Sequence, residues 1–121
     1  MLTLFVLNSG KKGKRVRESV ALLAGAISQL VFVDSPSEIL MENVDNEWFL
    51  VLYDNEAIDL NLATTIRFLI REPSEDIFSF MINGIEMQTQ SRLFRKGVVP
   101  IQNFTIAGWK SKLVLDGWVN V

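Results

Sequence analysis

The sequence contains no cysteine and no histidine, and each absence removes a class of chemistry. Without cysteine the chain has no disulfides, no thiolate metal sites and no cysteine nucleophile. Without histidine it lacks the commonest general base, the Ser-His-Asp arrangement and the ligands of nearly all zinc sites. A general base in this chain would therefore have to be a carboxylate.

Long apolar runs and a large excess of one charge are also missing. No apolar stretch reaches the ~18 residues that a membrane-spanning helix needs, and the opening MLTLFVLNSG lacks the basic-then-apolar order of a signal peptide. The net charge of −2 argues against nucleic-acid binding by electrostatics. We therefore expect a soluble, unsecreted protein that is cytoplasmic where it is made and has no membrane partner.

The composition is that of one folded domain. The chain has 121 residues, of which 49% are hydrophobic and 21% are charged. Single domains commonly hold about 100–150 residues, and this apolar content argues against disorder. We predict one domain over residues 1–121, with a core over 1–82 and a β-rich tail over 83–121.

Strand-like and helix-like patterns alternate through the core. The predicted strands are 2–7, 30–33, 49–53 and 77–82, with short candidates at 98–99, 104–106, 113–115 and 118–119. Three helices are predicted between these strands. The first has an apolar face formed by Val16, Val20, Leu23 and Ile27. The second begins with the capping sequence Ser35-Pro36-Ser37-Glu38 and ends near Asn43, and the third is capped by Asp59 and stops before Pro73.

This order predicts an α/β fold with a mostly parallel sheet, flanking helices and a short β-rich C-terminal segment. The continuous apolar run 49–53 suits a central strand covered on both faces. Ligands of such sheets bind beyond the carboxyl ends of the strands. The polar residues expected at that edge are Asn8, Ser9, Asp34, Ser35, Asp54, Asn55 and Glu56.

The acidic end of WFLVLYDNEAI, residues 48–58, has two interpretations. Asp54 and Glu56 could bind Mg²⁺ or Mn²⁺, which prefer oxygen ligands, and such a metal would offset charge on a diphosphate leaving group. The other interpretation is a polar strand end that leads into the helix capped by Asp59.

Three further groups of residues also have more than one interpretation each. The basic residues Lys11, Lys12, Lys14, Arg15 and Arg17 could hold a phosphate or an acidic protein surface near a helix N-terminus, or they form a solvated loop. In the segment 91–97, Arg92, Arg95 and Lys96 could bind an anion, or Arg92 could pair with a carboxylate at the strand edge, or the charges simply point outward from an ordinary strand edge. Trp48, Trp109 and Trp118 could form a stacking or partner surface, or they are packing residues.

Three segments together resemble a known family, the inverting family 2 glycosyltransferases of the GT-A fold. WFLVLYDNEAI resembles the family's W-x-L-x-L-D-x-D-E-x-(L/I) segment, and SRLFRKG at 91–97 resembles its later R-L-F-R segment. The first strand with LVFVDS at 30–35 looks like its opening β-α-β unit, in which an acidic residue helps to hold the nucleotide. The resemblance covers residues 2–97.

The resemblance implies a minimal GT-A-like domain and, if the domain is active, specific roles for its residues. An active domain would bind a nucleotide-sugar through Asn8, Asp34, Asp54, Glu56, Arg92 and Arg95. Asp54 and Glu56 would hold Mn²⁺ or Mg²⁺. The base would be Glu86, Asp116 or another acid, of which Glu86 is the better placed.

Two departures from the family pattern favour a domain that has lost catalysis. Tyr53 and Asn55 stand where the family has its aspartate pair, and only residues 35–47 separate Asp34 from Trp48, which leaves no room for a further strand–helix pair. We therefore expect a non-catalytic interaction module without a cofactor, which binds a protein partner or assembles with itself, as in a phage virion decoration or assembly component. The expected contact residues are Lys11, Lys12, Lys14, Arg15, Arg17, Trp109 and Trp118. The alternatives are a small active nucleotide-sugar transferase and an unrelated α/β binding protein.

Overall fold

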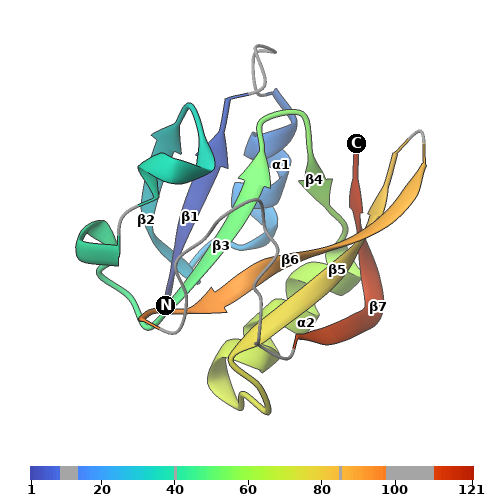
Figure 1. Ribbon diagram of the computed structural model, residues 1–121. Helices are drawn as coiled ribbons and strands as arrows, with labels where there is room; N and C mark the ends of the chain where they lie inside the picture. The colour runs from blue at the N-terminus through green and yellow to red at the C-terminus, as the bar shows by residue number, and fades with distance from the viewer. Residues whose placement is uncertain (9–13, 40, 85, 98–110) are drawn as a thin grey trace.

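The computed structural model describes residues 1–8, 14–39, 41–84, 86–97 and 111–121, which form one β-sheet with two α-helices (Figure 1). The strands are β1 (Leu2–Leu7), β2 (Ile27–Val33), β3 (Trp48–Tyr53), β4 (Ala57–Ile58), β5 (Ile77–Asn83), β6 (Met87–Arg95) and β7 (Lys112–Asn120). The helices are α1 (Lys14–Leu22) and α2 (Leu60–Arg71), and two 3-10 turns are η1 (Pro36–Glu38) and η2 (Met41–Asn43). Neither α-helix in these ranges is long and apolar enough to cross a membrane.

The strands follow the order β2-β1-β3-β6-β5-β7-β4 in a mixed sheet that curls into a half-barrel (Figure 1). β1 is parallel to both β2 and β3. β6 is antiparallel to β3 on one side and to β5 on the other. β7 is parallel to β5, and the short β4 pairs antiparallel with the end of β7.

The predicted mostly parallel, GT-A-like α/β fold is therefore wrong. The sheet is mixed in its second half: β6 is antiparallel to both β3 and β5, β4 is antiparallel to β7, and only β5 and β7 are parallel there. The helices do not flank both faces either, since α1 and α2 contribute to the same core cluster. The alternation of patterns located most elements and favours parallel pairing in the opening strand–helix–strand unit, but it does not determine which strands pair in the rest of the sheet.

The two faces of the sheet bury two separate cores. One face packs against the helices, and its core includes Leu4, Leu50 and Phe80 from the strands with Leu62 and Ile66 from α2. On the other face, residues of the segment around η1 and η2 cover a second core. That second core consists of Phe5, Leu7, Val33, Ile39, Val44, Phe49, Val51, Ile77 and Phe94. β3 supplies residues to both cores, which confirms that 49–53 is a central strand.

Several local predictions are corrected. The first helix ends at Leu22, and Ile27 begins β2 instead of continuing the helical face. The Ser35 side chain makes no capping bond, and Glu38 Oε2 accepts from the Asp34 N–H at 2.6 Å, so the predicted helix is reduced to short 3-10 turns. The predicted cap at Asp59 is confirmed. The candidates 113–115 and 118–119 belong to one strand, β7, whereas 98–99 and 104–106 lie outside the described residues.

Candidate functional site

The carboxyl ends of β1, β2 and β3 meet at one edge of the sheet, as their predicted parallel arrangement requires. The Asn8 N–H donates to the Val33 carbonyl at 3.0 Å, and the Asp54 N–H donates to the Leu7 carbonyl at 2.9 Å. Asn8, Asp34 and Asp54 therefore follow three adjacent strands. The structure brings these three predicted residues together at one edge of the sheet.

Glu56 closes the turn that follows β3. Its backbone N–H donates to the Tyr53 carbonyl at 3.1 Å, and its side chain folds back so that Oε1 accepts from the Tyr53 N–H at 2.6 Å. The residue is buried. A buried carboxylate is costly unless it is paired and hydrogen-bonded. The chemical role of Glu56 therefore depends on which group neutralises its charge.

The partner is Arg92 of β6. Arg92 Nη1 lies 2.6 Å from Glu56 Oε1, and Nη2 lies 2.9 Å from Glu56 Oε2, which is a two-point contact between a guanidinium and a carboxylate. Nη1 also donates to the Val51 carbonyl at 3.1 Å, and Gln90 Oε1 accepts from Nε at 3.0 Å and from Nη2 at 2.7 Å. A guanidinium has five N–H donors, and these five contacts occupy all of them.

The backbone explains why Arg92 reaches this position. The β5–β6 register passes from Phe78↔Leu93 to Ser79↔Ser91, so Arg92 sits in a β-bulge without a partner residue on β5. Bulges re-aim side chains in this way. On the other side, β3 and β6 are paired only up to Leu50↔Leu93. The Arg92 side chain bonds the next carbonyl of β3 and thus bridges the point where the two strands part.

The ion pair is almost completely shielded from water, with side-chain exposures of 1% for Arg92 and 4% for Glu56. The Arg92 guanidinium also lies 5.2 Å from the centroid of the Tyr53 ring, a distance suited to a cation–π contact. The predicted alternative in which Arg92 pairs with a carboxylate at the strand edge is confirmed. Its partner is one of the two residues proposed as metal ligands.

Glu56 and Arg92 are among the residues that line an open hollow of ≈ 520 Å³ between the turn after β3 and the β5–β6 hairpin. Asn55, Gln90 and the candidate base Glu86 line the same hollow as Glu56 and Arg92. Because both oxygens of Glu56 and all five donors of Arg92 are engaged within the protein, the pair is poorly suited to act as an acid, a base or a phosphate ligand. Glu86 is exposed and adds an unburied carboxylate to the hollow.

The arrangement fits a resident divalent metal poorly. Mg²⁺ and Mn²⁺ sites need several oxygen ligands, and among the described residues there is no group of three or more potential metal-ligating side chains. Asp54 is buried and engaged in an interaction of its own. Arg92 and the Tyr53 N–H use three of the about four lone-pair sites of the Glu56 carboxylate, so a cation would have to bind beside the positive charge of Arg92. Metal binding by these two residues stays a prediction.

Arg95 is not part of this hollow. It pairs with Trp48, the first residue of β3, whereas Arg92 reaches the far end of that strand. Its Nη1 lies 2.9 Å from Asp76 Oδ1, and its guanidinium lies 4.9 Å from the centroid of the Trp48 ring. The structure therefore separates the two arginines that the sequence placed in one anion site.

The predicted partner-binding residues are scattered. Arg15 and Arg17 lie in the first half of α1, where Arg17 is exposed, and Lys14 is the first residue of that helix. Trp118 is half-buried on β7, and its backbone N–H donates to Asp59 Oδ2 at 3.0 Å. Lys11, Lys12 and Trp109, like Ser9, lie outside the described residues.

Two residues that stabilise the region around the Glu56–Arg92 pair were not predicted from the sequence. Gln90 orients Arg92, and its spacing of two residues on an extended strand is the signal that could have identified it. Ser19 of α1 accepts from the Ile58 N–H at 3.0 Å in a buried contact and so fixes β4 beyond the Glu56 turn. A serine within a helical pattern carries no comparable signal.

In comparisons with known proteins, no protein-family model matches the sequence, and no curated protein matches it either.

Proposed function

We propose that the protein is a non-catalytic interaction module that pairs with a second copy of itself through the outer edge of β2. The observation that carries this proposal is the position and composition of β2. It is the terminal strand of the sheet, and within the described residues it pairs with β1 alone. A terminal strand presents unpaired backbone N–H and C=O groups, which are a template for another strand.

The side chains of β2 suit a second copy. Leu30 and Phe32 are exposed on the same side of the strand, at 43% and 67%. β2 contains no charged residue and no proline, although these are the usual protection of a terminal strand against pairing. A charged strand would find no counter-charge in β2, whereas a second copy brings the same uncharged row of side chains.

An antiparallel β2–β2 pair with its twofold axis at Leu30 satisfies these features. It places Leu30 opposite its own copy and Ser28 opposite Phe32 on the exposed side. Cross-strand pairs of this kind contribute roughly 0.2–1 kcal/mol each. Because the same surface is used on both subunits, the contact closes as a dimer and leaves no free copy of the surface.

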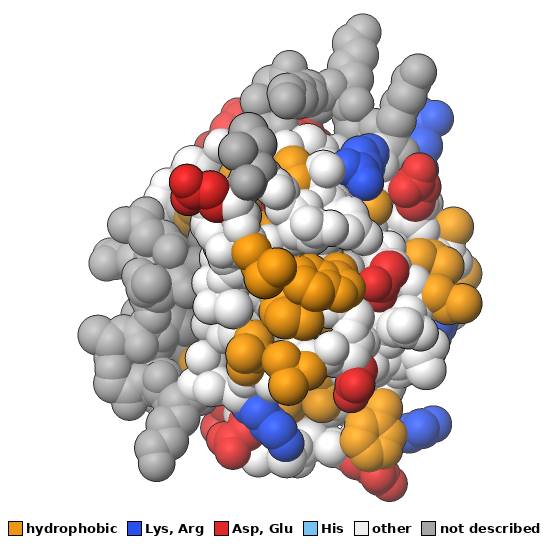
Figure 2. All heavy atoms as spheres, turned by 90° about the vertical axis from the view of Figure 1, so that its right-hand side faces the viewer, with side chains coloured by type: hydrophobic (Ala, Val, Ile, Leu, Met, Phe, Trp, Pro, Cys, Tyr) orange, Lys and Arg blue, Asp and Glu red, His pale blue; other side chains and the backbone are white. Residues whose placement is uncertain are grey.

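The other end of the sheet also exposes apolar side chains. Figure 2 shows apolar side chains gathered on that side of the molecule with acidic side chains beside them. The exposed leucines of β7, Leu113 and Leu115, alternate along a strand that also carries Lys112 and Asp116. These charges are the protection that β2 lacks, and the end of β7 is already paired with β4. We therefore prefer β2 as the contact surface.

Analytical ultracentrifugation over a range of concentrations tests the proposal. We expect reversible dimerisation of the unmodified protein and a monomer for Phe32→Glu, because each new carboxylate would lie opposite the neutral Ser28 of the second copy and would lose water without a counter-charge. Leu115→Glu is the matched control, since Leu115 is also 67% exposed, and it should leave the dimer intact. A monomer at every concentration, or a dimer lost only in Leu115→Glu, would refute the proposed surface.

The contacts of Glu56 favour this proposal over a metal-dependent nucleotide-sugar transferase, because both oxygens of the proposed metal ligand Glu56 accept from Arg92. A metal-independent transferase stays a prediction. Self-association would also suit a component of a phage particle, and that role stays a prediction.

A further inference from the structure

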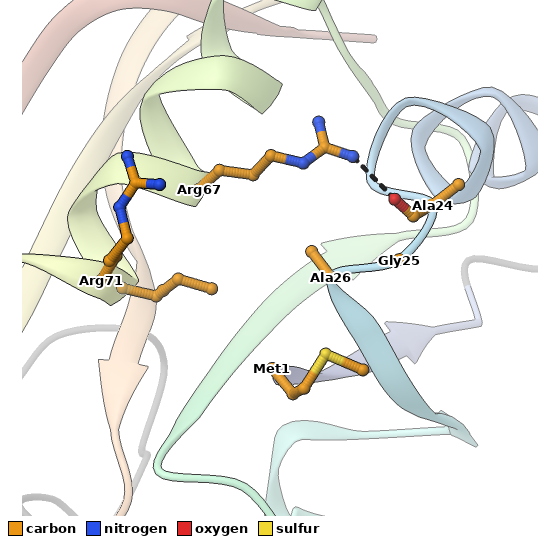
Figure 3. A pocket seen from close by; sticks show the side chains of 7 residues that line it. Met1, Ala24, Gly25, Ala26, Arg67 and Arg71 are labelled. Carbon is orange, nitrogen blue, oxygen red and sulfur yellow. Dashed lines mark hydrogen bonds between the residues drawn. The ribbon is translucent and has the colours of Figure 1, made fainter.

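A second hollow lies between the end of α2 and the turn that joins α1 to β2. Its volume is ≈ 500 Å³, and it is lined by Met1, Ala24, Gly25, Ala26, Arg67, Ile70 and Arg71. Arg67 and Arg71 are one helical turn apart and therefore lie on the same side of α2. Figure 3 shows Arg67 reaching across toward Ala24, with Arg71 one turn further along the helix. No acidic side chain is among these described lining residues.

The two guanidiniums retain most of their hydrogen-bonding capacity. Arg67 Nη2 donates to the Ala24 carbonyl at 2.9 Å, which holds the side chain in place and uses one of its five N–H donors. Within the described part of the chain, neither Arg67 nor Arg71 forms an ion pair with an acidic residue. This differs from Arg92, whose donors are all occupied.

Arginines in the last turns of a helix are favourable for another reason, because they interact with the negative end of the helix dipole. That effect requires neither a hollow nor a fixed guanidinium. The Ala24 contact orders Arg67 before any ligand arrives, which lowers the entropic cost of binding. The side chains of Ala26 and Ile70 add apolar surface beside the two charges.

We propose that this hollow binds a phosphoryl group, either as free phosphate or at the end of a small organic phosphate. Two guanidinium charges match the charge of about −1.5 to −2 on a phosphate monoester at pH 7. Their planar forks match phosphate oxygens in a way that ammonium groups do not. A carboxylate would neutralise only one of the two charges. This inference does not depend on self-association through β2.

The test is a titration followed by backbone amide NMR at constant ionic strength, with inorganic phosphate in one series and phenyl phosphate in the other. We expect saturable shifts confined to residues 24–26 and 67–71. Tighter binding of phenyl phosphate would indicate an organic phosphate that also uses the apolar surface, and equal binding would indicate free phosphate. Either result supports the site.

Variants separate this site from a general effect of charge. Arg71→Ala should weaken binding about tenfold or more, because a hydrogen bond to a charged group is lost. Arg71→Lys keeps the charge but not the fork, so it should bind more weakly than the unmodified protein and more tightly than Arg71→Ala. Lys112→Ala, which removes an exposed charge from β7, should bind as the unmodified protein does. Shifts that do not saturate, or equal weakening by Lys112→Ala and Arg71→Ala, would overturn the proposal.

Discussion

The buried pair between Glu56 and Arg92 should be one of the most sensitive points of the molecule. Glu56→Gln keeps the shape of the side chain but leaves the Arg92 charge without a counter-charge at 1% exposure. Arg92→Met leaves the Glu56 carboxylate with only the Tyr53 N–H among the contacts described above, and it removes the donors to Val51 and Gln90. Breaking a buried pair by removing one partner typically costs about 3–5 kcal/mol.

A loss of that size is large for a chain of 121 residues, since domains of this kind are stable by only about 5–15 kcal/mol. The double variant Glu56→Gln/Arg92→Met carries no buried charge at this place. It still leaves the Val51 carbonyl without its donor, which costs about 1–3 kcal/mol. We therefore expect the double variant to be less destabilised than the sum of the single variants, with a coupling of at least about 1 kcal/mol.

Urea denaturation followed by tryptophan fluorescence and far-UV circular dichroism measures these free energies, provided that the m-value stays constant across the four proteins. Costs below about 1 kcal/mol for each single variant would match an exposed ion pair and would refute the reasoning. A second measurement addresses the metal alternative. If Mn²⁺ stabilises the unmodified protein, and this stabilisation is lost in Glu56→Gln and increased in Arg92→Met, then Glu56 is a metal ligand for which Arg92 and the metal compete.

Two further predictions concern the crossing of β7 over the start of α2. Gly117 has φ +134°, and a Cβ placed there would lie 2.4 Å from the Leu62 backbone nitrogen, so Gly117→Ala should cost at least about 2 kcal/mol in urea denaturation. Gly97 has φ +84°, and no atom of the described residues lies within 4 Å of its Cβ position, so Gly97→Ala serves as the control and should cost about 1 kcal/mol. Asp59 accepts from the Leu62 N–H at 2.8 Å and from the Trp118 N–H at 3.0 Å, so Asp59→Ala should cost about 1–2 kcal/mol. Asp59→Ala should also accelerate hydrogen exchange of both amides, and unchanged exchange at Trp118 would contradict the second contact.

The parts of the fold that depend on local pattern were predictable from the sequence. The apolar runs located β1, β3 and β5, and the capping role of Asp59 is set by the residues around it. The opening β-α-β unit follows from the same signals, because a strand–helix–strand connection favours parallel pairing. That pairing is sufficient to place Asn8, Asp34 and Asp54 at one edge of the sheet.

The choice of strand partners was not predictable in this way. β6 reads as a polar strand over its first half and as an apolar one at Leu93 and Phe94, which is compatible with an outer or a central position. Its central position depends on pairing with residues of β3 that lie 43 to 47 positions earlier in the chain, from Leu50↔Leu93 to Trp48↔Arg95. The bulge at Arg92 is a consequence of matching β6 to two neighbours at once. No short window of sequence contains that requirement.

The same reasoning applies to the two segments that carry the likeness to family 2 glycosyltransferases. They are adjacent strands of one sheet, since Leu50 of the first pairs with Leu93 of the second. Both are apolar at this contact because both lie at the centre of the sheet, and the acidic and basic residues beyond it, Glu56 and Arg92, bind each other. Packing and one ion pair thus account for the apolar residues, the acidic end of the first segment and the leading arginine of the second. A pattern that is explained so completely by contact between its own two halves does not require a nucleotide-sugar site in addition.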